Sequence, residues 1–245
     1  NQPYLLEKLL ASIPQDKKDI QTIVVDDKSE STHLNAVKQL KEKYNFEFYQ
    51  NDKIKSAGIC RNIGLEKANG KWILFADGDD NFVSGFYDKI SKYFNSEKDV
   101  IFFSPKSQHI NTGKVADRHL SIEKIIKDYL NLKSRKSELL LRYNFMAPWS
   151  KMINKKFMDI HNIKFNKEFG AEDVMFSTKI GYFMKHFEVS KDVIYCIILR
   201  YGSNSRIFNE SLFDIRLNAR ISRIKFLNQN LSKKEKDELN SFIIN

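Results

Sequence analysis

The first 105 residues alternate between short apolar runs and amphipathic stretches, and this alternation leaves few folds open. Runs such as 20–25 and 71–76 are short and mostly apolar or β-branched, as buried strands are. Stretches such as 4–13 repeat apolar residues every three or four positions, as helices do. By the same criteria, strands are expected at 46–49 and 100–104, and helices at 33–44, 56–69 and 84–94. The alternation predicts an α/β fold with a parallel sheet covered by helices on both faces.

Helical patterns dominate after residue 105. Helices are expected at about 121–130, 134–143, 150–159, 172–185 and 210–230 and from residue 232, with one apolar strand at 193–199. The composition, 42% hydrophobic and 29% charged, is that of a globular protein. We therefore expect one α/β domain followed by a helical C-terminal part.

The chain is basic, with a formal net charge of +10, and the excess is greatest in the C-terminal third. Basic surfaces attract anionic partners, but no nucleic-acid-binding motif occurs, and we expect no nucleic acid as a partner. The expected helix at 210–230 mixes apolar residues with arginines, so it either packs on the domain or lies at an anionic membrane face. Cys60 and Cys196 show neither metal-type spacing nor a disulfide framework, which fits a reducing compartment.

Two acidic groups follow predicted strands. Asp26 and Asp27 end the run at 20–25, and Asp77, Asp79 and Asp80 end the run at 71–76. Ligands of open α/β sheets bind beyond the carboxyl ends of the strands, so neighbouring parallel strands would bring both groups to one crevice. A D-x-D pair in a turn can hold a hard divalent cation through oxygen ligands. The alternative is a solvated turn rich in aspartate, and the matched positions of the two groups favour a functional site.

A third acidic pair, Glu172 and Asp173, follows Gly170 at the start of an expected helix. Acids in the first turn complement the helix dipole, so the pair taken alone favours a structural explanation.

Four stretches carry a resemblance to a known family. In chain order they are "IVVDDKSEST" (23–32), "SAGICRNIGLEKANGKWILFADGDDNF" (56–82), "PWSKMINKKFM" (148–158) and "GAEDVMF" (170–176). Their order and spacing resemble the family 2 glycosyltransferases of bacterial polysaccharide and capsule synthesis, which have a GT-A fold. The resemblance implies a mixed, mainly parallel Rossmann-like sheet flanked by helices. It divides the chain into a nucleotide-sugar-binding half (1–105), an acceptor-binding and catalytic half (106–209) and a helical extension (210–245).

The implied activity is an inverting, metal-dependent transfer of a hexosyl or N-acetylhexosaminyl group. The donor would be a nucleotide-diphosphate sugar, foremost a UDP-sugar, and the acceptor a hydroxyl of a saccharide or lipid-linked saccharide in surface polysaccharide synthesis. Such an enzyme would work in the cytoplasm, or at the inner face of the membrane as a peripheral protein.

The resemblance also implies roles for residues on the donor side. Asp27 would contact the nucleoside, and Arg61 would lie near the donor. Asp77 and Asp79 match the D-x-D pair that binds Mn²⁺ or Mg²⁺ and the donor, with Asp79 the direct metal ligand. Asp80 would support them at the donor site.

On the acceptor side, Asp173 matches the catalytic base, and Glu172 would lie beside it near the acceptor. Trp149 would shape the acceptor site. Some relatives supply a C-terminal histidine to the metal or diphosphate. No histidine follows His186 in this chain, so Arg200 and Arg206 are the candidates for holding the diphosphate.

The family's first apolar strand would precede Asn1, so we expect the sheet of residues 1–245 to lack a central strand. Two alternatives to an active transferase stay open from the sequence. One is an inactive module that binds nucleotide sugars without turnover, and the other is a receiver-like Mg²⁺-binding signalling domain, which "IVVDD" also resembles.

Overall fold

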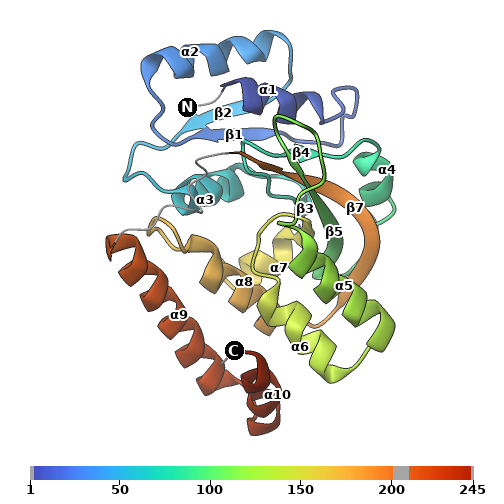
Figure 1. The fold of residues 1–245 in the computed structure, drawn as a ribbon. Helices are drawn as coiled ribbons and strands as arrows, with labels where there is room; N and C mark the ends of the chain where they lie inside the picture. The colour runs from blue at the N-terminus through green and yellow to red at the C-terminus, as the bar shows by residue number, and fades with distance from the viewer. Residues whose placement is uncertain (1–2, 201–209, 244–245) are drawn as a thin grey trace.

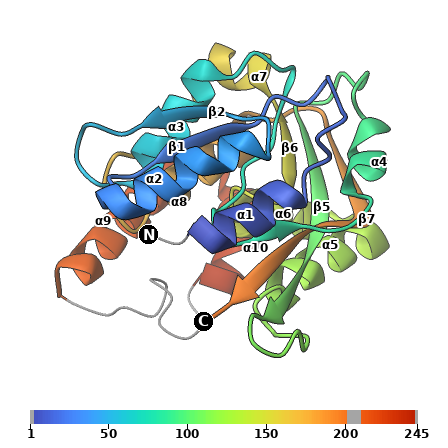
Figure 2. The same cartoon turned by 90° about the horizontal axis from the view of Figure 1, so that it is seen from above.

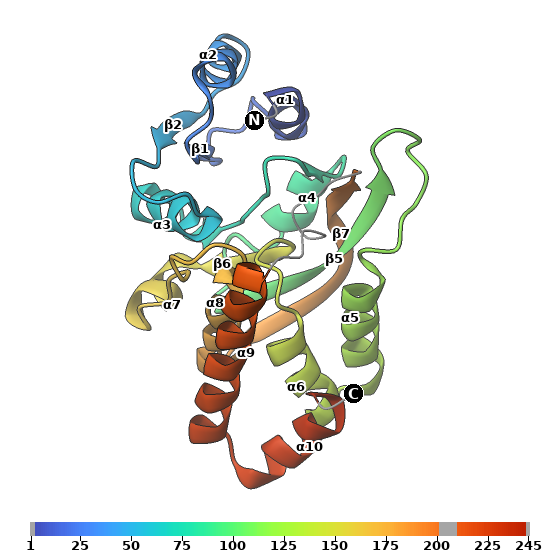
Figure 3. The ribbon, with the colours of Figure 1, turned by 60° about the vertical axis from the view of Figure 1, so that its left-hand side comes forward.

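The computed structural model describes residues 3–200 and 210–243, which form three parts along one axis (Figure 1). A small sheet with its helices lies at the top, a larger sheet lies in the middle, and a group of helices forms the lower part. The view in Figure 3 shows the top part set off from the larger sheet, with one helix near the junction.

The small sheet consists of two parallel strands, β1 (Ile23–Asp26) and β2 (Glu47–Gln50). The helices α1 (Pro3–Ala11) and α2 (Ser31–Gln39), with the short 3₁₀ helix η1 (Leu40–Glu42), lie against it, as Figure 2 shows from above. Buried Leu10, Leu40 and Phe46 form the small core of this part. The helix α3 (Ala57–Lys67) follows β2, and Ser56 caps it by accepting a hydrogen bond from the Ile59 amide.

The larger sheet has the strand order β3-β6-β5-β7-β4. Its strands are β3 (Trp72–Ile73), β4 (Asn81–Phe82), β5 (Val100–His109), β6 (Lys151–Asn154) and β7 (Phe187–Leu199). The long pair β5–β7 is parallel, whereas β3–β6, β5–β6 and β4–β7 are short and antiparallel. Most of the paired residues belong to the parallel pairs β1–β2 and β5–β7. The strands are thus mixed but mainly parallel, as expected.

The remaining helices of the domain are α4 (Phe86–Ser91), α5 (Leu120–Leu132), α6 (Arg135–Asn144), α7 (Lys155–Ile160) and α8 (Glu172–Phe183). The main hydrophobic core joins them to the larger sheet, and the strand β5 contributes four consecutive buried residues, 100–103, to it. Such continuous burial is typical of a strand covered on both faces.

The structure corrects three sequence expectations. The strand expected at 71–76 is limited to β3, and residues 151–154 of an expected helix form β6 instead. Within the described residues, β1 pairs with β2 and β3 pairs with β6, so the strands that lead to the two acidic groups are not neighbours in one sheet.

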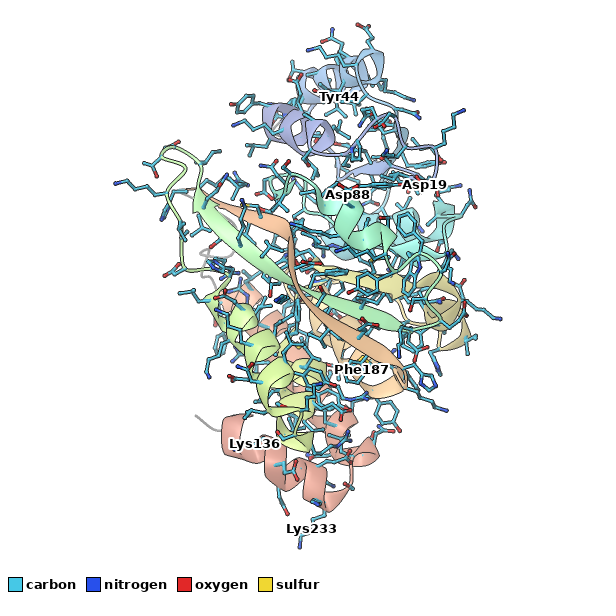
Figure 4. The ribbon with its side chains drawn as sticks, turned by 90° about the vertical axis from the view of Figure 1, so that its right-hand side faces the viewer. Asp19, Tyr44, Asp88, Lys136, Phe187 and Lys233 are labelled. Atoms are coloured by element: carbon cyan, nitrogen blue, oxygen red, sulfur yellow. The ribbon has the colours of Figure 1, made fainter. Side chains whose placement is uncertain are left out.

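The C-terminal helices α9 (Glu210–Asn230) and α10 (Lys233–Ile243) pack beneath the domain. Leu139 and Tyr143 of α6 form a second core with Leu227, Leu231 and Leu239. Figure 4 places Lys136 of α6 and Lys233 of α10 at the same end of the molecule. None of the described helices combines the length and apolar character that crossing a membrane requires.

Candidate functional site

A cleft of about 1520 Å³ brings together residues from both sheets and from α3, α8 and α9. It contains the acids after β1, the acidic turn after β3 and the acidic start of α8, which are far apart in sequence. The two strand-end acid groups therefore share a cleft although their strands are not paired.

The first acidic group is held by the loop before α3. Asp27 accepts hydrogen bonds at Oδ1 from the Asn51 side chain (2.8 Å) and the Ser56 amide (3.1 Å). Asp26 is buried, and its Oδ2 accepts from the Ser29 amide at 3.0 Å. The two bonds to Asp27 fix the orientation of its carboxylate at the wall of the cleft.

The acidic turn is anchored to β7 through its last member. Asp80 is 4% exposed, and it accepts hydrogen bonds from the Tyr195 hydroxyl and the Ile198 amide, both at 2.8 Å. The same hydroxyl accepts a bond from the Asp77 amide at 2.9 Å. Burial, together with the neighbouring Asp77 charge, raises the pKa of Asp80 to about 8. Asp80 thus holds the turn in place. The carboxylates of Asp77 and Asp79 in the same turn are more exposed than that of Asp80.

Arg61 of α3 joins the acidic turn to the start of α8. Its guanidinium lies 2.7 Å from Asp77 Oδ1 and 3.1 Å from Glu172 Oε1. The Arg61 side chain is only 17% exposed and also lies over the Phe165 ring. Because its charge serves two carboxylates, Arg61 ties the acidic turn to α8 and is not a free cation in the cleft.

The start of α8 carries the third acidic pair, as the sequence indicates. Glu172 and Asp173 occupy the first turn, and the Glu172 side chain also accepts a bond from the Gly170 amide at 3.0 Å. Burial, and then the adjacent Glu172 charge, raises the pKa of Asp173, while Arg61 lowers it in part. A carboxylate with a raised pKa is a better proton acceptor at neutral pH than an ordinary aspartate.

Trp149 and Arg200 complete the lining of the cleft beside β7. Trp149 is 9% exposed and stacks on the Tyr195 ring, with centroids 5.3 Å apart. One face of the indole is therefore occupied by the protein itself. Arg200 follows β7 and donates two hydrogen bonds to Asp79 Oδ2, from Nη2 at 2.7 Å and from Nε at 3.2 Å.

The model of the glycosyl transferase family 2 matches residues 1–158, well over half of the chain. The chain belongs to this family. Membership sets aside the receiver-like alternative.

Curated relatives and solved structures agree with this assignment. The GalNAc(5)-diNAcBac-PP-undecaprenol beta-1,3-glucosyltransferase of Campylobacter jejuni is 27% identical over 203 residues, covering 77% of this chain and 61% of that protein. The poly(ribitol-phosphate) beta-N-acetylglucosaminyltransferase TarS of Staphylococcus aureus is 23% identical over 256 residues, covering 100% of this chain and 42% of that protein. The chain thus spans less than two thirds of each of these two relatives.

A crystal structure of S. aureus TarS 1–349 with UDP-GlcNAc superposes with a TM-score of 0.68 at 23% identity, covering 97% of this chain and 67% of that one. The mannosyltransferase PcManGT of Pyrobaculum calidifontis, in complex with GDP-Man and Mn²⁺, gives a TM-score of 0.58 at 14% identity, covering 98% and 76%. The protein therefore has the GT-A fold of its family.

In this family 2 glycosyltransferase, nine of the ten candidate residues from the sequence lie in the described part, and all nine line the cleft. They are Asp27, Arg61, Asp77, Asp79, Asp80, Trp149, Glu172, Asp173 and Arg200. Arg206 lies outside the described residues.

Three further residues shape the site and were not found from the sequence. Tyr195 holds Asp77 and Asp80, and Asn51 holds Asp27. Lys151 is 1% exposed, and it donates to the Phe145 carbonyl at 2.7 Å. Tyr195 and Asn51 carry no local signal, whereas a lysine between Trp149 and the apolar pair Met152–Ile153 could have indicated a buried charge.

Proposed function

We propose that this protein transfers a hexosyl or N-acetylhexosaminyl group from a nucleotide-diphosphate donor to an acceptor hydroxyl, with inversion, in bacterial surface polysaccharide synthesis. The observation that carries the proposal is the Arg61 bridge, which joins the acidic turn at Asp77 to the acidic start of α8 at Glu172. A donor site and a proton acceptor on opposite sides of one reaction centre are what inverting transfer requires.

On the donor side, we assign Asp27 to the nucleoside and the acidic turn to the diphosphate, foremost that of a UDP-sugar. Solved structures of similar fold contain UDP-GlcNAc in TarS and GDP-Man in PcManGT, and these names support the donor class. Asp27 suits the role because its carboxylate is already oriented by Asn51 and Ser56.

The acidic turn fits Mn²⁺ or Mg²⁺ that is shared with the donor. The side chains of Asp77 and Asp79 are 36% and 34% exposed in the cleft, and both offer carboxylate oxygens to a cation. Across residues 3–200 and 210–243, no three His, Cys, Asp or Glu side chains form a metal-binding group. Such cations commonly use one or two carboxylates and take their other ligands from substrate phosphates and water. When bound, the metal would neutralise the departing diphosphate.

On the acceptor side, we assign Asp173 as the general base, with Glu172 and Trp149 beside it. Trp149 is 9% exposed with one face stacked on Tyr195, so it would shape the wall of the acceptor site. Arg61 would keep α8 in register with the donor turn, so that Asp173 meets the acceptor hydroxyl near the anomeric carbon. The C. jejuni relative is named for an undecaprenol-linked substrate, which supports a lipid-linked acceptor. With such an acceptor, this protein would work at the inner membrane face.

Calorimetric titration with UDP, UDP-GlcNAc, UDP-glucose and GDP-mannose, with Mn²⁺ or in excess EDTA, tests the donor and metal assignments. We expect one UDP-sugar to bind best, with Mn²⁺ strengthening binding and Asp79→Ala removing that gain. Asp88→Ala, on α4 outside the cleft lining, is the matched control and should bind as the wild type does. Equal donor affinity in Mn²⁺ and in EDTA would refute the metal assignment, and absence of nucleotide binding would refute the proposed function.

The inactive-module alternative is distinguished by turnover. It predicts the same titrations without any sugar transfer or donor hydrolysis. Release of UDP from the best donor, measured over hours with and without bacterial lipid extract as acceptor, separates the two.

A further inference from the structure

The carboxylate of Asp79, the proposed metal ligand, is paired with Arg200. Arg200 directs two N–H groups at a single oxygen, Asp79 Oδ2, at 2.7 and 3.2 Å. The pair is partly sheltered, with side chains 26% and 34% exposed. Charge-assisted bonds of this kind are roughly twice as strong as neutral ones.

The geometry around this pair is held from both sides. Asp80, next to Asp79, is bonded to Tyr195 and Ile198 of β7, and Arg200 follows the end of the same strand. The acidic turn therefore cannot move away from the end of β7 without breaking the buried hydrogen bonds of Asp80. Because Arg200 directly follows this strand, its backbone is held close to Asp79.

A divalent cation and the Arg200 guanidinium compete for Asp79. Arg200 occupies one of the two carboxylate oxygens, Oδ2. Its positive charge also repels a second cation bound to the same carboxylate. Asp77, the other carboxylate of the D-x-D pair, is bonded to Arg61. The protein alone thus offers a free metal ion two carboxylates that are already neutralised.

A nucleotide diphosphate changes this balance. Its oxygens supply further metal ligands, and they also give Arg200 a second anionic partner, since planar guanidinium binds phosphate as well as carboxylate. Transfer of Arg200 from Asp79 to the diphosphate would leave Asp79 Oδ2 open to the metal.

We propose that Arg200 couples the two ligands, by pairing with the Asp79 carboxylate until a nucleotide diphosphate draws the guanidinium away. The inference rests on the proposed donor site and adds an order to its loading: the metal binds weakly alone and well together with the diphosphate. By thermodynamic linkage, the metal strengthens diphosphate binding by the same factor.

The test is Mn²⁺ binding to the full chain, followed by the EPR signal of free Mn²⁺, with and without saturating UDP. We expect Arg200→Gln to bind Mn²⁺ alone about 2–5-fold more tightly than the wild type, as loss of a partly exposed charged pair would give. The strengthening by UDP should shrink in this variant. Arg200→Lys keeps a charge but not the two-point contact, and should give intermediate values.

Arg118→Gln is the matched control, because it removes a positive charge from the lining of the same cleft without touching Asp79. It should change Mn²⁺ affinity by less than about twofold, as a screened charge does. An Arg200→Gln variant that folds and binds Mn²⁺ alone no better than wild type overturns the inference, while wild-type UDP and Mn²⁺ binding still supports the proposed function. If wild-type protein binds neither UDP nor Mn²⁺, the proposed function itself fails.

Discussion

Asp173 is the residue on which the proposed chemistry depends most directly. It lies in the first turn of α8, and burial raises its pKa. Asp173→Asn keeps the size and shape of the side chain but removes its capacity to accept a proton. We expect donor binding to persist and the single-turnover transfer rate to fall by roughly 10²–10⁴-fold, the usual contribution of a general base.

The control is Asp159→Asn on α7, an exposed acid outside the cleft lining, which should transfer at the wild-type rate. A near-normal rate in Asp173→Asn would assign the acidic pair a structural role at the helix start. Such a role is worth only about 0.3–1 kcal/mol and would appear in the free energy of unfolding instead.

Lys151 is a lysine buried in the core beside the site. Its Nζ lies 4.4 Å from the centre of the Phe145 ring and bonds the Phe145 carbonyl. Burial lowers the pKa of Lys151 from 10.5 to about 7. Between these two values the unfolded chain holds a proton that the folded protein has released, so this lysine makes the free energy of unfolding rise with pH from about 7 to 10.5.

We therefore expect Lys151→Met to remove a pH dependence of up to about 1.4 kcal/mol per pH unit in that window. Below pH 7 the variant should equal or exceed the wild type in stability, because the charged form is no longer buried. Urea unfolding from pH 6 to 9 measures the difference, with Lys124→Met on exposed α5 surface as the control. Parallel wild-type and Lys151→Met curves would contradict the shifted pKa.

At the scale of elements, the approach of α3 to the loop before α8 depends on a glycine. A Cβ added to Gly58 would lie 2.0 Å from the Asn166 carbonyl oxygen and 2.8 Å from Glu172 Cβ. Gly58→Ala must therefore push α3 away from the start of α8, where Arg61 makes its bridge. We expect a loss of about 1–3 kcal/mol in the free energy of unfolding, as for other overpacked positions, and weaker donor binding.

Gly64 in the same helix provides the matched control. An added Cβ there would meet only Val25 Cγ2 at 3.9 Å, an ordinary contact. Gly64→Ala should stabilise the protein by up to about 1 kcal/mol, since alanine is the better helix former. Thermal unfolding of both variants decides the matter: equal effects would show that the α3–α8 contact has room to relax.

At the scale of the whole molecule, α9 has two apolar sides. Leu212, Ala219 and Leu227 are buried, so this helix packs on the domain, which is one of the two alternatives that the sequence left open. Leu217, Ile221 and Ile224 are 43%, 39% and 44% exposed. Arg220 and Lys225 are exposed on the same helix. An exposed apolar stripe flanked by bases suits the headgroup region of an anionic membrane, where a lipid-linked acceptor would be found.

We expect the protein to sediment with vesicles containing anionic lipid at low salt, and to be released as salt is raised. Ile221→Glu should weaken this association at least several-fold, because it places a negative charge in the stripe. Neutral vesicles are the control. Protein that stays in the supernatant with anionic vesicles at low salt would leave α9 a packing helix only.

Sequence alone determined the local features of this protein. Most helices, the Ser56 cap and the positions of the acids after β1, in the turn at 77–80 and at the start of α8 follow from hydrophobic period and capping, which act between residues close in the chain. The motifs also carried the family resemblance. All of the candidate residues that were chosen from these signals, and that the structure describes, line the cleft.

Only the tertiary structure decided which segments meet. Residues 151–154 fit a helical period, yet they form β6 because pairing with β3 and β5 buries Met152 and Ile153 completely. The Arg61 bridge to Glu172, the Tyr195 bonds to the acidic turn and the Arg200–Asp79 pair each join residues about a hundred positions apart. Local period carries no information on such contacts, because they are selected by packing and by the cost of closing long loops.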